Sequence, residues 1–301
     1  MSESITWSFN SVSDVASVVS MLAEKGETFE LGTSGLTIKT DMTVWIGGKS
    51  PNFIVKSMYE TKNTAPDGLG DRMKGNYEGR QRMYLTRRTP VIMRLDGKAF
   101  HTLLHKAEKP FDMKVISAMQ RTAAVLLHEV QGAKCAYIQS DEISILITDF
   151  DKLTTAAWFD YNIQKMVSVA AGIASVSFTQ FYGQRGIFDA RVFNIPKEEV
   201  INYFRWRYKD WLRNSIQALA QSMFSPKQLH GKKTADMQEM CFQAGRNWND
   251  CKAVEKNGTF IPIIKTEAVG ELWTIINMMK DDDPTNIFIN SVLYPPPEKE
   301  E

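Results

Sequence analysis

The sequence predicts an α+β fold built around a ferredoxin-like βαββαβ unit, an antiparallel sheet with helices on one face. The first observation behind this prediction is the order of segments between residues 89 and 195, where short apolar runs alternate with long amphipathic helices. The second is composition, because 43% of the 301 residues are hydrophobic, enough to fill a sizeable core. A small N-terminal α+β unit and extra C-terminal helices are expected on either side.

Residues 1–62 are expected to form a small α+β accessory unit. Residues 5–9 have strand character, and Asp14 is a good N-cap for a helix over 15–25 that Gly26 would end. Short alternating runs separated by Gly, Ser and Asp turns follow. No chemical motif occurs in this stretch, so its role stays open.

Residues 63–88 are predicted to form a linker and a basic helix. Gly, Pro and Asp open the segment, and a helix is expected over residues 71–86. Residues 71–88 include six basic and two acidic residues, a local balance of +4. A phosphate-rich partner and a plain solvated helix face explain this charge equally well.

The central domain is predicted to span residues 89–257. Residues 89–95 are almost continuously apolar, which favours a central strand. Asp112 is expected to cap the next helix, whose apolar residues recur at intervals of three and four. A hairpin follows, with residues 139–142 at its turn. The remaining predicted elements are a helix over 153–181, a strand over 190–195 and a helix over 198–223.

The C-terminal segment, residues 258–301, is expected to add two further elements and an acidic tail. Residues 260–264 have strand character, and residues 267–279 are predicted to be helical. The last residues, rich in Pro and Glu, have the composition of a disordered end.

Composition excludes several classes of protein. The net charge is only +1, although residues 205–213 carry a local balance of +3. The three cysteines form no paired pattern, and Cys241, Cys251 and His230 lack the short Cys-x-x-Cys clip of a zinc site. No apolar stretch approaches the roughly 20 residues that span a bilayer, and the first residues have no signal-peptide layout. A cytoplasmic location without membrane contact is expected.

Two acidic residues stand where the predicted sheet would bring them together. Asp96 ends the apolar run of the first strand, and Asp141 lies 45 positions later in the hairpin turn. Palm-type nucleotidyltransferases place two carboxylates side by side in this order of elements. Such a pair can bind two divalent metal ions about 3.5–4 Å apart. A turn-forming or helix-capping role for each aspartate is the plain alternative.

The residues around Asp96 add candidates for metal and phosphate binding. Gly97 has no Cβ, so its carbonyl could join a metal shell, and Mg²⁺ suits such a site because it takes few protein oxygens. Lys98 and Lys109 are candidate triphosphate ligands. Lys165 could reach the same face, although a lone helical lysine usually faces solvent. His101 could stack on a base or position a phosphate, or be an ordinary polar histidine.

Five motifs resemble those of the tRNA-histidine guanylyltransferase superfamily, the 3′–5′ RNA polymerases. The resemblance covers about residues 70–255, well over half of the chain. The motifs are Met93-Arg-Leu-Asp-Gly-Lys-Ala-Phe-His, Lys109-Pro-Phe-Asp, Tyr137-Ile-Gln-Ser-Asp-Glu-Ile-Ser, Phe188-Asp-Ala-Arg and Trp206-Arg-Tyr-Lys-Asp.

The resemblance implies a polymerase-type palm that adds nucleotides to the 5′ end of tRNA. The catalytic residues would be Asp96 and Asp141, which with the Gly97 carbonyl would hold two Mg²⁺ ions. ATP or GTP would serve as activating and substrate nucleotides, and the enzyme would be a homotetramer. The implied nucleotide-binding residues are Asp96, Gly97, Lys98, Ala99, Phe100, His101, Lys109, Ser140 and Asp141. Possible phosphate or tRNA contacts are Lys165, Arg207, Arg213, Asn214 and Lys232.

One segment departs from the eukaryotic pattern of this family. Eukaryotic histidine-tRNA enzymes carry His-Ile-Asn-Asn-Leu-Tyr-Asn after the Trp-Arg motif, whereas this chain has Leu212-Arg-Asn-Ser-Ile-Gln-Ala, in which only the asparagine is clearly kept. The chain is therefore more similar to the bacterial, archaeal and phage guanylyltransferase-like branch, which repairs tRNA 5′ ends by templated addition. Non-templated addition of guanosine to histidine tRNA is the alternative. A palm-fold nucleotide cyclase and a non-catalytic RNA-binding protein are more distant ones.

Overall fold

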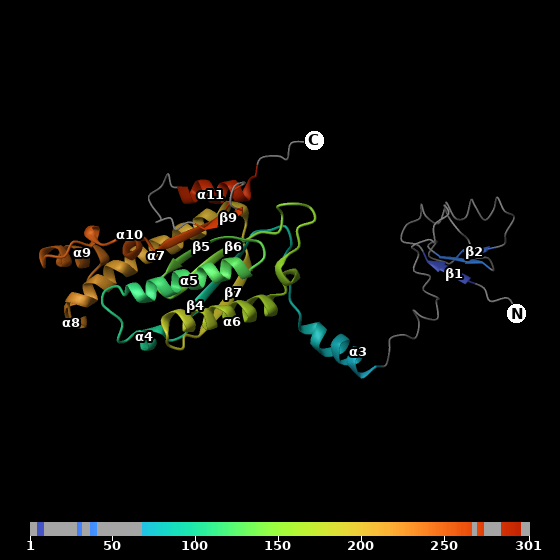
Figure 1. Ribbon diagram of the computed structural model, residues 1–301, viewed down its shortest axis with the longest axis horizontal. Coiled ribbons are helices and arrows are strands. Elements are labelled where there is room, and N and C mark those ends of the chain that lie inside the picture. Colours follow the sequence, from blue (N-terminus) through green and yellow to red (C-terminus); the bar gives the residue numbers. More distant parts are fainter. Residues whose placement is uncertain are drawn as a thin grey trace. The chain divides into compact units, whose positions relative to one another are not determined.

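The computed structural model of the chain describes residues 5–8, 29–31, 37–40, 68–266, 270–273 and 284–295. The chain divides into two units, Met1–Gln81 and Arg82–Glu301, which are drawn in Figure 1.

The first unit contains a three-stranded antiparallel sheet in the order β1-β3-β2. β1 (Ile5–Ser8) and β2 (Phe29–Leu31) both pair with β3 (Thr37–Thr40). The strand predicted at residues 5–9 is confirmed. The helix predicted over 15–25 lies outside the described residues.

The predicted basic helix over 71–86 is shorter and less regular than expected. α3 (Leu69–Met73) continues as a π-helical turn (Lys74–Glu78) and a 3₁₀ turn (Gly79–Gln81). Glycine weakens an α-helix by about 1 kcal/mol relative to alanine, and two glycines interrupt this segment. At Gly79 a Cβ would lie 2.7 Å from the carbonyl oxygen of Lys74. The helical segment therefore ends before the predicted boundary.

Six antiparallel strands form the sheet of the second unit, in the order β7-β4-β6-β5-β8-β9. Their bounds are β4 Val91–Gly97, β5 Ala133–Gln139, β6 Glu142–Ile147, β7 Phe188–Asn194, β8 Thr259–Thr266 and β9 Gly270–Trp273. The first four strands and the two helices between them follow the βαββαβ order of a ferredoxin-like unit, so the fold prediction is confirmed.

The C-terminal part of the sheet differs from the prediction. β8 pairs with β5 and confirms the strand predicted at 260–264. The helix predicted over 267–279 is wrong at residues 270–273, which pair with β8 as strand β9. The segment therefore extends the sheet at its β5 edge.

The helix α5 (Met113–Glu129) covers one face of the sheet, and its predicted cap is confirmed. The carboxylate of Asp112 accepts backbone N–H bonds from Lys114 at 2.8 Å and from Val115 at 3.3 Å. Two hydrogen bonds of this kind satisfy donors that a helix start otherwise leaves without acceptors. The cap therefore fixes where the helix begins.

The helix α6 (Ile163–Tyr182) packs beside α5 on the same face, and it begins later than the predicted residue 153. Residues Trp158–Tyr161 form a 3₁₀ turn with positive φ at Phe159 and Asp160. Asn162 then caps α6 through its side-chain oxygen. Residues in the left-handed conformation end a helix even where the spacing of apolar residues continues. The apolar spacing therefore predicts a start for α6 that is too early in the sequence.

The second face of the sheet is covered by helices that follow the βαββαβ unit, in keeping with the predicted extra C-terminal helices. α7 (Lys197–Met223) and α11 (Pro284–Leu293) pack there. Alternate residues of each strand point to opposite faces, so the sheet has two cores. The core under α5 and α6 includes Met93, Leu95, Ile138 and Phe178, and the core under α7 and α11 includes Ile92, Tyr137, Phe204 and Phe260.

A smaller apolar cluster lies at the C-terminal half of α7. α8 (Pro226–Leu229), α9 (Thr234–Gln243) and α10 (Ala253–Asn257) surround the C-terminal half of α7. Their core contains the buried residues Leu219, Ala220, Leu229 and Cys241.

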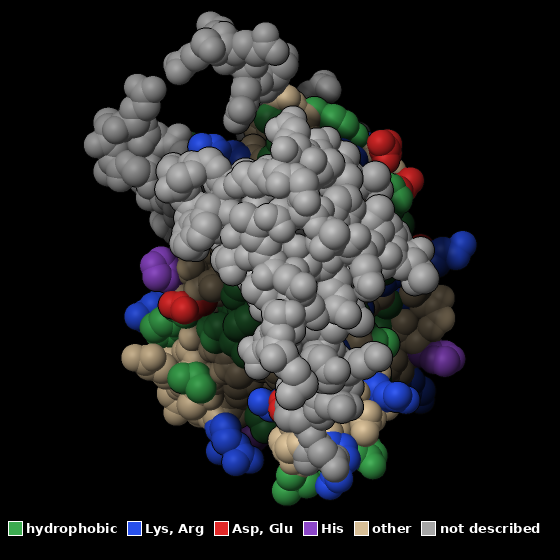
Figure 2. Space-filling view, turned by 90° about the vertical axis from the view of Figure 1, so that its right-hand side faces the viewer, with side chains coloured by type: hydrophobic (Ala, Val, Ile, Leu, Met, Phe, Trp, Pro, Cys, Tyr) green, Lys and Arg blue, Asp and Glu red, His purple; other side chains and the backbone are tan. Residues whose placement is uncertain are grey.

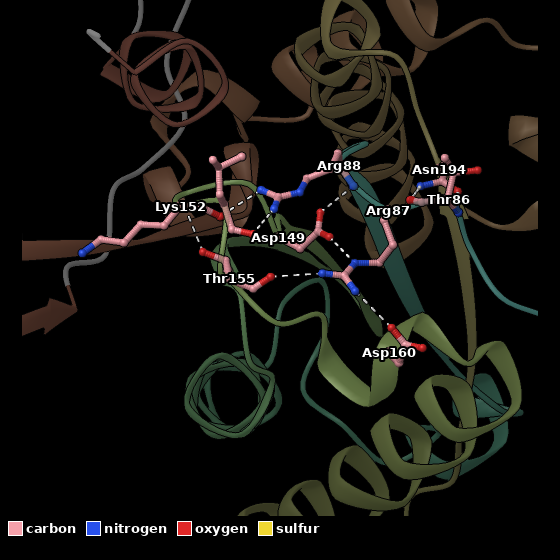
Figure 3. Close-up of polar contacts among 9 residues, drawn as sticks. Thr86, Arg87, Arg88, Asp149, Lys152, Thr155, Asp160 and Asn194 are labelled. Carbon is pink, nitrogen blue, oxygen red and sulfur yellow. Dashed lines mark hydrogen bonds and ion pairs between the residues drawn. The ribbon is translucent and has the colours of Figure 1, made fainter. Parts of the chain in front are cut away.

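The chain entering β4 is tied to the loop after β6, as Figure 3 shows. The carboxylate of Asp149, fully buried, accepts the Nε–H of Arg87 at 2.5 Å and the backbone N–H of Arg88 at 2.9 Å. The guanidinium of Arg87 also donates to Asp160 at 3.1 Å and to the carbonyl of Thr155 at 3.0 Å. These bonds hold the start of the central strand in register with the loop.

Charged side chains of both signs lie around the visible rim of the face drawn in Figure 2, interspersed with hydrophobic ones. No helix among the described residues is long and apolar enough to cross a membrane.

Candidate active site

The two predicted catalytic aspartates lie side by side at one end of the sheet. Asp96 is the next-to-last residue of β4, and Asp141 lies in the turn between β5 and β6. The backbone N–H of Gly97 donates to the carbonyl of Asp141 at 3.1 Å, which joins the two segments directly. The predicted adjacency of the two acids is therefore present.

The carboxyl group of Asp141 has a raised pKa, as expected for an acid that is partly buried beside other acids. Burial raises the pKa of its carboxyl group, and the nearby charge of Asp96 raises that pKa further, although the backbone N–H of Asp141 and the Ser140 hydroxyl oppose the shift. Removing a carboxylate from water and placing it beside another both disfavour its charged form. A cation between the two groups would relieve this unfavourable charge.

The oxygen ligands available at the two aspartates suit Mg²⁺, the metal ion that the family resemblance implies. Within the described residues no three His, Cys, Asp or Glu side chains converge on one point. Mg²⁺ is usually bound through one or two carboxylates and completes its octahedron with phosphates and water. Asp96, Asp141 and the carbonyl of Gly97 are the groups that would hold it.

Packing requires a glycine at position 97. A Cβ at this position would meet the ring of Phe100 at 2.4 Å. That ring is 2% exposed and packs against Phe178 and Phe188, with centroids 4.9 and 5.1 Å away. The side chain of Phe100 thus belongs to the core, so only the backbone of this predicted nucleotide-binding residue can face a ligand.

The short helix α4 (Phe100–Leu103) follows directly after the first aspartate. Ala99, with φ of 55°, turns the chain into it. Lys98 and His101 are exposed there. The backbone N–H of Lys98 is already used, because it donates to the carbonyl of Ile187 at 2.8 Å. The side chains of Lys98 and His101 can therefore reach solvent or a ligand.

A cavity of about 430 Å³ opens beside the two aspartates. It is bounded by the end of the sheet, by α5, by the loop before α5 and by one face of α7. Its walls include Asp96, Lys109, Ser140, Asp141, Arg207 and Asn214 from the predicted set. Its volume falls within the range of small-molecule sites, so predicted residues far apart in the sequence share one pocket.

Three other predicted residues lie elsewhere. Lys165 is exposed on α6, with its Nζ 5.8 Å from the ring centroid of Phe159. Lys232 is exposed between α8 and α9. Arg213 is exposed on α7, where its guanidinium donates to Asp210. These three residues do not line the cavity, and neither do the predicted nucleotide-binding residues Gly97, Lys98, Ala99, Phe100 and His101.

A buried ion pair beside the site was missed by sequence reasoning. Glu142 lies directly opposite Asp96 in the β4–β6 register, on the face that α7 covers. Its carboxylate accepts two bonds from Arg207, Nε at 2.8 Å and a terminal nitrogen at 2.7 Å. The same terminal nitrogen of Arg207 donates to Asp210 at 3.1 Å. Arg207, predicted as a tRNA or phosphate contact, is thus engaged within the protein.

The local sequence gave little sign of this pair. Glu142 and Arg207 are 65 positions apart, and Arg207 stands among other basic residues that resemble a solvated face. The available signal was the helical spacing, because Arg207, Trp211, Asn214 and Ala218 recur at intervals of three and four and all line the cavity.

Comparison with a family model supports the resemblance. Residues 70–196 match the model described as tRNAHis guanylyltransferase. Among curated proteins, an uncharacterized protein of Acanthamoeba polyphaga mimivirus is 28% identical over 246 residues, covering 70% of this chain and 83% of that protein. The probable tRNA(His) guanylyltransferase of Drosophila melanogaster is 28% identical over 193 residues, covering 57% of this chain and 66% of that protein.

Solved structures are similar over most of their length. A bacterial tRNA(His) guanylyltransferase (Thg1)-like protein in complex with ATP is 41% identical, with a TM-score of 0.65, and covers 69% of this chain and 91% of that one. A bacterial structure of the same description in complex with GTP is 37% identical, with a TM-score of 0.67, and covers 76% and 100%. The Saccharomyces cerevisiae enzyme, 19% identical with a TM-score of 0.55, shares the fold.

Proposed function

Because the chain belongs to the tRNAHis guanylyltransferase family of nucleotidyltransferases, we propose that it is a metal-dependent 3′–5′ nucleotidyltransferase acting on the 5′ end of tRNA. The observation that carries this proposal is the contact between the Gly97 N–H and the Asp141 carbonyl, which sets Asp96 beside Asp141 in the lining of the cavity. ATP or GTP would enter that cavity, in line with the nucleotides bound by the bacterial relatives.

In the proposed reaction the 3′-hydroxyl of the incoming nucleotide attacks the activated 5′ phosphate of the tRNA. A new O–P bond forms, the bond to pyrophosphate or AMP breaks, and the hydroxyl proton is lost to solvent. Mg²⁺ bound by Asp96, Asp141 and the Gly97 carbonyl would lower the pKa of that hydroxyl and neutralise charge on the leaving group. The protein's own part is positioning and electrostatics.

Each residue of the site has a defined task in this scheme. Asp96 and Asp141 supply the two negative charges that a cation needs, and Lys109, on the wall of the cavity, would neutralise triphosphate oxygens. The Arg207–Glu142 pair holds the wall behind them, since both side chains are about nine-tenths buried. The hydrogen bond from the Gly97 N–H to the Asp141 carbonyl holds the ends of the two segments that carry the acids together.

We further propose that the added nucleotide is chosen by base pairing, as in repair of truncated tRNA 5′ ends. The stretch Leu212-Arg-Asn-Ser-Ile-Gln-Ala differs from the eukaryotic segment at this place. The bacterial structures are also more similar to this chain, at 41% and 37% identity, than the yeast enzyme at 19%. A homotetramer and a role for the basic segments in tRNA binding stay predictions.

The decisive assay uses tRNA lacking its first nucleotide, with each of the four bases placed opposite the gap. Product that follows the opposite base supports templated repair, whereas guanosine added in every case supports the histidine-tRNA role. Asp96→Asn and Asp141→Asn should each abolish addition, while Asp250→Asn, an exposed aspartate in a 3₁₀ turn after α9, should not. Full turnover by either of the first two variants would contradict the proposed site.

A further inference from the structure

Trp206 is an exposed aromatic side chain next to the candidate active site. It lies on α7, which the structure describes throughout, and 53% of its surface is exposed. No other large hydrophobic side chain on α7 is exposed to that degree. A single exposed hydrophobic side chain is ordinary on a protein surface, so the groups around Trp206 decide whether it forms a binding site.

The ring of Trp206 is held by three neighbours. The guanidinium carbon of Arg207 lies 4.5 Å from the ring centroid and that of Arg94 lies 6.0 Å from it. Tyr203 packs edge-on at 5.8 Å, and its hydroxyl is hydrogen-bonded to Ser144 at 2.8 Å. Arg207 is fixed in turn by its bonds to Glu142. A ring so supported is already ordered before any ligand arrives.

Trp206 stands close to the catalytic strand. Arg94 lies two residues before Asp96 on β4, and both side chains point to the face that α7 covers. Two residues along a strand span about 7 Å. A ligand stacked on Trp206 would therefore end near the two aspartates.

The cavity and Trp206 lie on different sides of α7. The cavity is lined by Arg207, Trp211 and Asn214, and Trp206 is rotated by about 100° from that row because it precedes Arg207 by one residue. A nucleotide can occupy the cavity while a second group contacts Trp206. The two positions thus suit two different substrates.

The surface around Trp206 is rich in positive charge. Arg94 and Arg191 face each other in the β4–β7 register, and Lys209 and Arg213 are exposed further along α7. Arg191 is paired with Asp189, and Arg213 with Asp210, so part of this charge is already balanced. Cationic side chains beside an open aromatic ring are the composition of a surface that binds unpaired nucleotides.

We propose that Trp206 is the stacking platform for the terminal nucleobase at the 5′ end of the RNA substrate. The base lies on the indole ring, and Arg94 and Lys209 neutralise phosphates next to it. This assignment rests on the proposed function and replaces Arg207, whose guanidinium is engaged with Glu142, as the RNA contact in this segment. Stacking on tryptophan tolerates any base, as repair of different tRNAs requires.

The test compares Trp206→Leu, Trp206→Phe and the control Phe242→Leu, where Phe242 is a 60% exposed aromatic on α9. Trp206→Leu should raise the KM for truncated tRNA about tenfold while the KM for ATP and GTP is unchanged. Trp206→Phe should restore most of the loss, and the control should behave as wild type. A tRNA with 2-aminopurine at its 5′ terminus should be quenched by wild type and not by Trp206→Leu.

Salt dependence adds a readout that a purely structural role would not produce. Stacking involves no counterions, so Trp206→Leu should shift the plot of log affinity against log salt without changing its slope. Lys209→Gln should lower that slope by about 0.7–0.9. An unchanged KM for tRNA in Trp206→Leu overturns the proposal, as does loss of self-association without loss of tRNA affinity. Wild-type activity in Asp96→Asn would instead contradict the proposed function itself.

Discussion

Replacing Arg207 by methionine should destabilise the second unit strongly, because it leaves the buried carboxylate of Glu142 without its positively charged partner. Arg207 and Glu142 have side chains only 9% and 10% exposed, and two charge-assisted bonds of 2.8 and 2.7 Å join them. Breaking one partner of such a pair costs about 3–5 kcal/mol, since the remaining charge is left without compensation. For a unit of this size that loss corresponds to a fall in Tm of roughly 6–20 °C.

The control is Arg213→Met. Arg213 is on the same helix and bonds to the same Asp210, but its side chain is 57% exposed. An exposed ion pair contributes about 0–1 kcal/mol. The two arginines thus differ in burial and not in chemistry, and urea unfolding of both variants measures that difference.

A double variant tests the reasoning behind the magnitude. Adding Glu142→Gln to Arg207→Met removes the stranded charge, so most of the lost unfolding free energy should return. The interaction term of the double-mutant cycle should therefore be several kcal/mol. A loss below about 1 kcal/mol for Arg207→Met, or simple additivity in the double variant, would refute the argument that the buried carboxylate dominates.

Three further outcomes follow from particular contacts. Gly97→Ala should lower unfolding free energy by about 1–3 kcal/mol and abolish nucleotide addition, because its Cβ would meet Phe100 at 2.4 Å. Asp112→Ala should cost about 1 kcal/mol at neutral pH. Burial alone would raise the pKa of Asp112, but the backbone N–H bonds that it accepts lower its pKa overall. The wild type therefore has this stabilisation above the ordinary pKa of an aspartate and loses it as the pH falls further. The difference in unfolding free energy between wild type and variant should accordingly shrink below about pH 4 in denaturation curves. Arg87→Met should lower Tm in thermal unfolding, because the fully buried carboxylate of Asp149 loses the Nε–H bond; an unchanged Tm would contradict the role of that contact.

The elements that the sequence predicted well are those whose cause is local. The cap at Asp112 and the apolar spacing after it define α5, and the continuous apolar run before Asp96 defines the central strand. The hairpin turn around Asp141 was found because short strands flank polar residues. Each of these signals lies within about 20 residues, so no tertiary information was needed.

The elements that were missed depend on distant partners or on backbone angles. The strand at Gly270–Trp273 exists because β8 offers an edge, and a helical pattern was expected there instead. The left-handed turn at Phe159 delayed the start of α6 without changing its periodicity. Arg207 looked like a surface cation because its partner is 65 positions away. Burial of a charge cannot be inferred from charge pattern alone.

The helix α7 carries two rows of side chains that serve two different parts of the proposed site. One row of its side chains, including Arg207 and Asn214, closes the cavity where a nucleotide would bind. The neighbouring row presents Trp206 toward solvent over Arg94. Because the Arg207–Glu142 pair fixes the rotation of α7 against the sheet, it sets the direction in which each row faces and hence where each of two substrates would lie relative to the two aspartates. Arg207→Met combined with Glu142→Gln should therefore fold while still adding nucleotides more slowly than wild type, with raised KM values for both tRNA and nucleotide.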